Sequence, residues 1–432
     1  MQFGSKNLLQ KYLFAIFSIV IVSTVFAKGA VSDKTLRAKT IENIANDDVS
    51  GEDLKIRKVA IEALGNRAGT VVVMSAQTGR IYSIVNQDWA IRRGFKPCST
   101  IKLVTAVAGY NERLIHANGR LVNGSFRLGL DQSLSYSNNT FFQKVGKNLG
   151  SNKMIRYARK LGLGERTGIN SPGEFRGKLP FGNENLRIYS HADDFEVTPL
   201  QLAVMVSALT NGGDLLIPRI VRRKYQKSNF KGFYRRELGL SPNVFERVIP
   251  GMVGAVRYGT AKSIRRPRLK IAGKTGSCIA RKTWVGLFAS VAPITNPRFA
   301  VVVITEGKYA RGKHSAKIAG RIYQALSPRF NERFDGKLAR KTIKTRPIDS
   351  KRPIKIVTGV AQIEKKPDHK NKPDSMKIRT GLGQIHKKRS TKKTNQKVKY
   401  RKKKETKKPN HLFPTIVIGG KSEITRPRVV KN

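Results

Sequence analysis

Three short motifs along the chain carry residue types that can perform nucleophilic acyl transfer. In chain order they are Ser99-Thr100-Ile101-Lys102, Ser137-Asn138-Asn139 and Lys274-Thr275-Gly276. The chain holds 85 Lys and Arg residues, so a Ser-x-x-Lys match arises easily by chance and each motif alone is weak. Their order and their local contexts together make the signal specific.

The chemistry explains why these residue types are needed. A serine hydroxyl becomes an effective nucleophile only beside a base. A helix that begins near Ser99 would place Lys102 one turn further along the same face. Lys102 can accept the serine proton only if burial or a nearby cation lowers the pKa of its amine, and Lys274 would supply that cation. Ser137 would then relay a proton to the leaving amine, and Asn139 would hydrogen-bond a substrate amide.

The third motif is predicted to be an edge strand. Gly276 would leave room for the substrate to lie alongside as an added strand. Lys274, Thr275 and Ser277 would bind a terminal carboxylate. The sequence thus predicts substrate binding at residues 274–277 and covalent chemistry at Ser99.

The flanks of the motifs resemble the transpeptidase domain of penicillin-binding proteins, from about residue 60 to about residue 325. The matching segments are Pro97–Lys102, Ser137–Phe142, Thr198–Leu202, Asn211–Gly213, Gly259–Ala261 and Ala272–Gly276. The motif triplet is shared with class A β-lactamases. The resemblance implies a serine acyltransferase that acts on D-Ala-D-Ala peptides of peptidoglycan, is acylated by β-lactams, and needs no cofactor and no metal.

The resemblance also implies an oxyanion hole formed by the backbone N–H groups of Ser99 and Ser277. The two cysteines of the chain, Cys98 and Cys278, each adjoin one of these donors. If the two N–H groups lie a few ångströms apart, their neighbours are within bridging reach. We therefore expect a Cys98–Cys278 disulfide, similar to the cysteine pair of some carbapenem-hydrolysing class A β-lactamases; two buried free thiols are the rival. Residue 98 is usually glycine in the family, so Cys98 is a departure.

The predicted fold is α+β, an antiparallel sheet flanked by helices with an all-helical subdomain, and the transpeptidase domain is expected over residues 61–330. Strands are expected at residues 70–74, 80–85, 271–276, 283–291 and 299–304. Helices are expected at residues 54–64, from 99, at 138–149, at 152–161, from 199 and at 315–326.

The first 27 residues are expected to direct export. Lys6 and Lys11 precede an apolar run from Tyr12 to Phe26, which is short for a membrane-spanning helix of about 20 residues. The segment Val25-Phe26-Ala27 fits a signal-peptidase site. A cleaved signal peptide and an uncleaved anchor in the inner membrane both stay open, and either places the body in the periplasm or at the cell surface. Residues 28–60 are mostly polar and are predicted to be a linker.

Residues 331–432 are predicted to form a disordered polybasic tail. They hold about 32 Lys and Arg against about 8 Asp and Glu, within a net charge of +57 for the chain. Such a segment cannot bury enough apolar surface to fold alone. Its expected partner is an anionic polymer or a phospholipid surface; a spacer without a specific partner is the alternative. Nucleic acid is not expected, because an exported chain rarely meets it and the tail lacks interleaved aromatic residues for base stacking.

Two other functions compete with the transpeptidase. A class A β-lactamase needs a glutamate that positions the hydrolytic water, and Glu165 and Glu174 lie in the corresponding stretch. Their sequence contexts resemble penicillin-binding proteins instead. The third possibility is a non-enzymatic β-lactam sensor or a scaffold that binds peptidoglycan, and the complete set of motif residues argues against it.

Overall fold

The computed structural model describes residues 32–222, 230–332 and 337–339. The chain divides into two compact units, residues 1–347 and 348–432, and all described residues belong to the first. The expected leader (residues 1–27) and nearly all of the expected tail (residues 331–432) lie outside the described residues. Within the described ranges, no helix combines the length and the apolar character needed to cross a bilayer.

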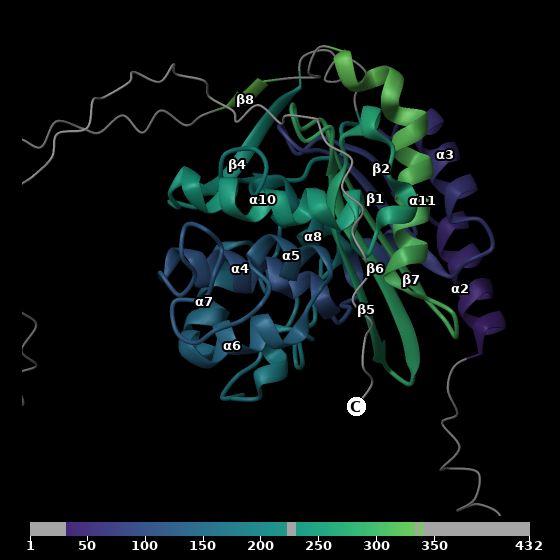
Figure 1. Ribbon diagram of the computed structural model, residues 1–432. Coiled ribbons are helices and arrows are strands. Elements are labelled where there is room, and N and C mark those ends of the chain that lie inside the picture. Colours follow the sequence, from purple (N-terminus) through teal and green to yellow (C-terminus); the bar gives the residue numbers. More distant parts are fainter. Residues whose placement is uncertain (1–31, 223–229, 333–336, 340–432) are drawn as a thin grey trace, which may run out of the picture. The chain divides into compact units, whose positions relative to one another are not determined.

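A five-stranded antiparallel sheet organises the described unit (Figure 1). Its spatial order is β2-β1-β7-β6-β5, so β5, which carries the third motif, is an edge strand as predicted. The strands are β1 (Gly69–Ser75), β2 (Ile81–Val85), β5 (Ala272–Ala280), β6 (Thr283–Ala292) and β7 (Phe299–Glu306). Strands β1, β2 and β7 are buried along their whole length, because helices cover both faces of the sheet.

Helices α3 and α11 cover one face of the sheet, and α8 covers the other (Figure 1). Beyond α8 lies the all-helical part that was predicted. The helices are α2 (Asp33–Ala45), α3 (Leu54–Leu64), α4 (Lys102–Asn111), α5 (Leu130–Ser135), α6 (Asn139–Leu149), α7 (Ser151–Lys160), α8 (Pro199–Ala208), α10 (Pro242–Arg257) and α11 (Gly312–Leu326).

Local sequence signals fix where the helices near the site begin. Helix α8 starts with a capping box, in which the Thr198 hydroxyl accepts from Gln201 N and the Gln201 side chain accepts from Thr198 N. Pro199 occupies the first helical position, as predicted. Helix α6 is capped by the Asn138 side chain, which accepts a hydrogen bond from Phe141 N at 2.9 Å.

The linker predicted over residues 28–60 is wrong for Asp33–Ala45, which form α2. The helix predicted at residues 54–64 is confirmed as α3 (Leu54–Leu64). The polar face of α2 misled the prediction, because two of its polar side chains are buried through specific hydrogen bonds. Asn43 Nδ2 donates to Asn86 Oδ1 at 3.0 Å, and Thr40 Oγ1 accepts from Gly69 N at 3.3 Å.

A second, smaller sheet was not predicted. It has the order β3-β4-β8 and pairs β3 (Asp214–Ile217) with β4 (Lys231–Glu237) in antiparallel fashion. The strand β8 (Lys337–Ala339) pairs with β4 in parallel. Of the two sheets, the five-stranded one contributes side chains to the site described below, and the smaller sheet does not.

Candidate active site

The first motif forms a tight turn of helix that aims a lysine at a serine. Residues Cys98–Ile101 are a 3₁₀-helix, and α4 begins at Lys102. Side chains three residues apart eclipse one another in a 3₁₀-helix. The Nζ of Lys102 consequently lies 3.1 Å from the Oγ of Ser99. Lys102 is fully buried, whereas Ser99 is half-exposed, so the serine faces solvent and its base does not.

The second motif supplies three more partners for the same amine. The Nζ of Lys102 donates to Ser137 O at 2.6 Å, to Ser137 Oγ at 3.0 Å and to Asn139 Oδ1 at 2.6 Å. Ser137 adopts a left-handed backbone with φ 58°, which turns the chain between α5 and α6. Asn139 itself is exposed, so its amide nitrogen stays accessible while its oxygen is engaged.

The third motif brings a second lysine to Ser137. The Nζ of Lys274 lies 2.8 Å from Ser137 Oγ and 2.9 Å from Thr275 O. Burial lowers the pKa of Lys102 to about 7. Burial, and secondarily the charge of Lys102, holds the pKa of Lys274 well below its ordinary value. One hydroxyl therefore connects two buried amines, and Lys102 can be neutral near physiological pH.

A cleft opens in front of these groups. Its volume is about 420 Å³, and its lining residues are Ser99, Ser137, Thr260, Thr275, Ser277, Arg311 and Lys313. Thr275 and Ser277 alternate along β5 with Lys274 and Cys278, so the two pairs point to opposite faces of the strand. The predicted nucleophile thus shares one cavity with the predicted carboxylate-binding side chains of Thr275 and Ser277.

Gly276 allows two segments of the chain to pack closely. A Cβ at this position would lie 3.1 Å from Pro97 O and 3.3 Å from Cys98 Cβ. The space on the Cβ side of Gly276 is therefore filled by the segment that precedes Ser99. The absent side chain lets the nucleophile segment approach β5.

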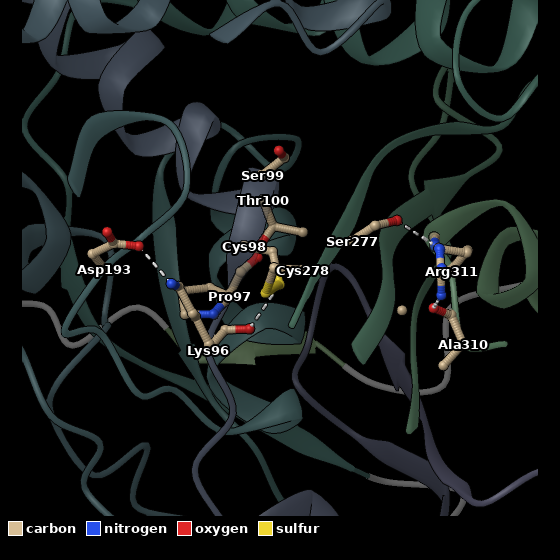
Figure 2. The surroundings of a disulfide bond; sticks show 12 residues. Lys96, Pro97, Cys98, Ser99, Thr100, Asp193, Ser277, Cys278, Ala310 and Arg311 are labelled. Atoms are coloured by element: carbon tan, nitrogen blue, oxygen red, sulfur yellow. Dashed lines mark hydrogen bonds and ion pairs between the residues drawn. A yellow bond between two sulfur atoms is a disulfide. The ribbon is translucent and has the colours of Figure 1, made fainter. Parts of the chain in front are cut away.

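The predicted disulfide joins Cys98 to Cys278 (Figure 2). The two Cα atoms are 5.7 Å apart, and 180 positions separate the residues in the sequence. Cys98 immediately precedes Ser99, and Cys278 immediately follows Ser277. The bond therefore ties the start of the nucleophile segment directly to the edge strand β5.

The backbone angle at Cys98 shows why glycine would suit this position. Its φ is 48°, in the left-handed region that favours glycine, and a side chain there costs roughly 1 kcal/mol or more. The chain two residues earlier is held independently, because Lys96 Nζ pairs with Asp193 Oδ1 at 2.5 Å (Figure 2). The disulfide and this ion pair together hold the strained backbone in place.

Three cleft residues carry polar groups that the sequence reasoning did not assign. Thr260 Oγ1 shares a hydrogen bond of 2.6 Å with Thr275 Oγ1, which fixes the orientation of the latter. The guanidinium of Arg311 stacks on the Trp284 ring at 3.4 Å, and Lys313 adds a second positive charge. Thr260 lies in Gly259–Ala261, a segment that resembles the family, so its position could have been noticed. No local sequence signal marks Arg311 or Lys313 as cleft residues.

No metal site competes with this arrangement in the part of the chain that the structure describes. There, no group of three or more His, Cys, Asp and Glu side chains is placed to hold a metal ion.

Comparison with known proteins gives the same picture. The model of the penicillin binding protein transpeptidase domain matches residues 69–324. The peptidoglycan D,D-transpeptidase MrdA of Acinetobacter baumannii is 23% identical over 363 residues, which cover 63% of this chain and 52% of MrdA. The chain spans about half the length of the curated relatives it matches most strongly.

Two solved structures share the fold. The Pseudomonas aeruginosa PBP2 in complex with WCK 5153 has a TM-score of 0.57 and 21% identity, over 68% of this chain and 80% of the other. Penicillin binding protein 3 from Mycobacterium tuberculosis, complexed with aztreonam, has a TM-score of 0.53 and 21% identity, over 65% and 77%. With the matched domain covering more than half of its length, this chain belongs to the penicillin-binding protein transpeptidase family.

Proposed function

We propose that this chain is an exported serine D,D-transpeptidase that cross-links peptidoglycan stem peptides ending in D-Ala-D-Ala. The observation that carries the proposal is the 3.1 Å contact between Ser99 Oγ and the buried amine of Lys102. The names of the relatives support the reaction class, and the expected leader at residues 1–27 supports export. Residues 99, 102, 137, 139 and 274 are assigned as the catalytic set.

In acylation, the Oγ of Ser99 attacks the carbonyl carbon of the penultimate D-Ala while its proton passes to the neutral amine of Lys102. The resulting tetrahedral oxyanion would be bound by the backbone N–H groups of Ser99 and Ser277. Ser137 then delivers a proton to the nitrogen of the terminal D-Ala, which leaves as the free amino acid. The proton on Lys102 replenishes Ser137 across their 3.0 Å contact.

In deacylation, an acceptor amine attacks the ester carbonyl of the acyl-enzyme and passes a proton through Ser137 to the neutral amine of Lys102. Lys102 then gives that proton to the Oγ of Ser99 as the ester bond breaks. If water attacked in place of the amine, the acyl-enzyme would be hydrolysed, which is the reaction of a carboxypeptidase. A β-lactam follows the first half of this path, since its strained amide acylates Ser99 and its ring nitrogen stays attached to the adduct. Because this group does not leave, deacylation of the adduct is blocked.

Substrate orientation rests on the positive end of the cleft. Thr275 and Ser277 offer hydroxyls, and Arg311 and Lys313 offer positive charge, to the terminal carboxylate of the donor peptide. Asn139 offers its amide nitrogen to the peptide backbone. Gly276 has no side chain and would contribute only its main-chain groups.

The contacts of two glutamates favour a transpeptidase over a β-lactamase. Glu174 accepts hydrogen bonds from Thr167 N at 2.6 Å and from Gly168 N at 3.0 Å. Glu165 pairs with Arg236 at 2.9 Å and with Arg235 at 3.1 Å. Neither carboxylate lines the cleft, so neither is placed to position a hydrolytic water at an acyl-enzyme.

The experiment combines intact mass with a product assay. The purified chain is incubated briefly and then for hours with benzylpenicillin, and separately with a D-Ala-D-Ala donor peptide plus an amine acceptor. We expect a long-lived penicilloyl adduct, release of D-alanine and incorporation of the acceptor. Rapid loss of the adduct would indicate a β-lactamase. A stable adduct without release of D-alanine would indicate a sensor or scaffold.

A further inference from the structure

A second cavity lies apart from the catalytic cleft, beside the C-terminal end of α11. Its volume is about 830 Å³, roughly twice that of the cleft, and the two share no lining residue. Its walls are the loop at residues 265–270, the turn after β6 at residues 293–296, and the segment that ends α11. The catalytic proposal leaves this cavity without a function.

The charged lining of this cavity is entirely positive. Arg265, Arg266, Arg268 and Lys270 all line it and are all exposed. Within residues 32–222 and 230–332, none of these four side chains makes an ion pair or a hydrogen bond. The remaining polar lining groups are neutral, among them the amides of Asn296 and Gln324. We name this cavity the arginine pocket.

The charge is also not neutralised from nearby elements. Between Glu246 and Glu332 the sequence holds one acidic residue, Glu306. Glu306 pairs with Arg93 at 2.7 Å, and Glu332 pairs with Arg329 at 3.0 Å. The loop, the turn and the end of α11 that line the pocket therefore hold no carboxylate, and its positive potential is available to a ligand.

The loop that carries the cations is anchored. Ile264 and Leu269 are buried at 6% and 5% exposure, so the loop is pinned to the core on both sides of its arginines. Lys270 O accepts a hydrogen bond from Ile294 N at 2.9 Å, which joins the loop to the turn opposite. Positive groups held on a fixed loop lose less conformational entropy when they bind a ligand.

We propose that the arginine pocket binds a phosphorylated ligand through a phosphodiester or pyrophosphate group. The planar guanidinium fork matches phosphate oxygens bidentately, and three such forks with one ammonium suit a ligand that carries more than one negative charge. The chain beyond residue 331 carries about 32 Lys and Arg against about 8 Asp and Glu, so its charge does not complement that of the pocket. The ligand is therefore a separate molecule, either a soluble phosphate compound or the headgroup of an anionic lipid.

The test is residue-resolved, because the basic tail also attracts anions. The full chain is treated with phenylglyoxal, which modifies accessible arginines, with and without inorganic pyrophosphate, and the modified peptides are quantified by mass spectrometry. We expect pyrophosphate to slow the modification of Arg265, Arg266 and Arg268 by about tenfold, while Arg156, an exposed arginine on α7, reacts as before. Equal protection of Arg156 would overturn the proposal, as would no protection at all.

A matched pair of variants checks the affinity directly. R265Q/R266Q/R268Q removes three charges from the pocket, and K55Q/K147Q/R156Q removes three exposed charges elsewhere. Lys270 is retained so that each variant removes three positive charges. Dialysis with labelled pyrophosphate should show about tenfold weaker binding for the pocket variant relative to its control. Identical binding by the two variants would contradict the proposal, and unchanged acylation by penicillin would show that both are folded.

Vesicles identify the source of the phosphate. The footprint is repeated with vesicles of phosphatidylglycerol and, as the neutral control, of phosphatidylcholine. Protection of the three pocket arginines by phosphatidylglycerol as well as by pyrophosphate assigns the pocket to a lipid headgroup. Protection by pyrophosphate alone assigns it to a soluble phosphate compound. Protection by phosphatidylcholine to the same degree as by phosphatidylglycerol would show contact without phosphate recognition and would overturn the proposal.

Discussion

The amine of Lys102 lies 3.1 Å from the hydroxyl of Ser99, and the lysine is completely buried. Burial favours the neutral amine, so the pKa of Lys102 falls to about 7. Only the neutral form can accept the serine proton. This single relationship makes the reactivity of Ser99 depend on pH in a defined direction.

We predict that the acylation rate rises with pH through an inflection near 7 and then levels off. Below this pH Lys102 is protonated and cannot act as base; above it the amine is free. Stopped-flow acylation by a chromogenic cephalosporin measures the profile. His191→Gln is the control, because burial also lowers the pKa of this nearby histidine. A flat profile, or an inflection that disappears in the control, would contradict the role of Lys102.

The same shift has a consequence for stability. The pKa of Lys102 is about 7 in the fold and near 10.5 in the unfolded chain, so between these values the unfolded chain binds more protons. The contribution of Lys102 to the free energy of unfolding therefore rises with pH across this window. Denaturant titrations at several pH values should show this rise, and Lys102→Met should reduce the slope. An unchanged slope in that variant would mean that another group titrates.

Removal of the Ser137 hydroxyl should slow acylation without abolishing it. This oxygen lies 3.0 Å from Lys102 Nζ and 2.8 Å from Lys274 Nζ, and the proposed proton path runs through it. A lost general acid typically costs roughly 10² to 10⁴ in rate. Ser137→Ala removes only the hydroxyl and keeps the Cβ. Ser137→Gly, which suits the φ of 58°, shows any effect of the backbone separately. Wild-type acylation rates in both variants would exclude the relay.

The Cys98–Cys278 bond should affect both stability and rate. It closes a loop of 180 positions, for which the chain-entropy model allows up to about 5 kcal/mol. A drift between the proposed oxyanion donors would weaken transition-state binding, where one donor is worth about 3 kcal/mol. We expect C98G/C278S to melt at lower temperature and to be acylated more slowly. Glycine suits the left-handed backbone at residue 98, so C98A/C278S shows the cost of strain separately.

The bond itself is checked by mass. Under denaturing, non-reducing conditions, protein purified from its own compartment should take up no thiol-alkylating reagent. Uptake of two alkyl groups would show that the cysteines are free in the cell. A variant without the bridge that retains wild-type acylation kinetics would limit the disulfide to a structural role.

The site was predictable because each of its motifs is local. The spacing of Ser99 and Lys102 determines their contact within one helical turn, and the strand β5 carries Lys274, Thr275 and Ser277 in regular alternation. The sequence could not reveal that Gly276 makes room for Pro97 and Cys98, because that packing joins segments far apart in the chain. Nor could it place Arg311 beside the cleft, since its position depends on how α11 docks on β6.

The fold was predicted best where burial is apolar and periodic. The strands β1, β2, β5, β6 and β7 lie at the residues where strands were predicted, to within a few positions at their ends. The helix α2 was missed because its buried contacts are polar, such as the hydrogen bond between Asn43 and Asn86. Polar burial of this kind depends on a partner 43 positions away, which composition does not show.

The most direct test of the central claim is the site of the penicillin adduct. Wild-type protein, Ser99→Ala and the control Ser151→Ala, which lies on α7 outside the cleft, are incubated with benzylpenicillin, digested and mapped by tandem mass spectrometry. The account predicts one penicilloyl group on Ser99 in the wild type and the control, and no adduct in folded Ser99→Ala, because the members of a catalytic unit fail together. An adduct on another residue, or labelling that persists in folded Ser99→Ala, would contradict it.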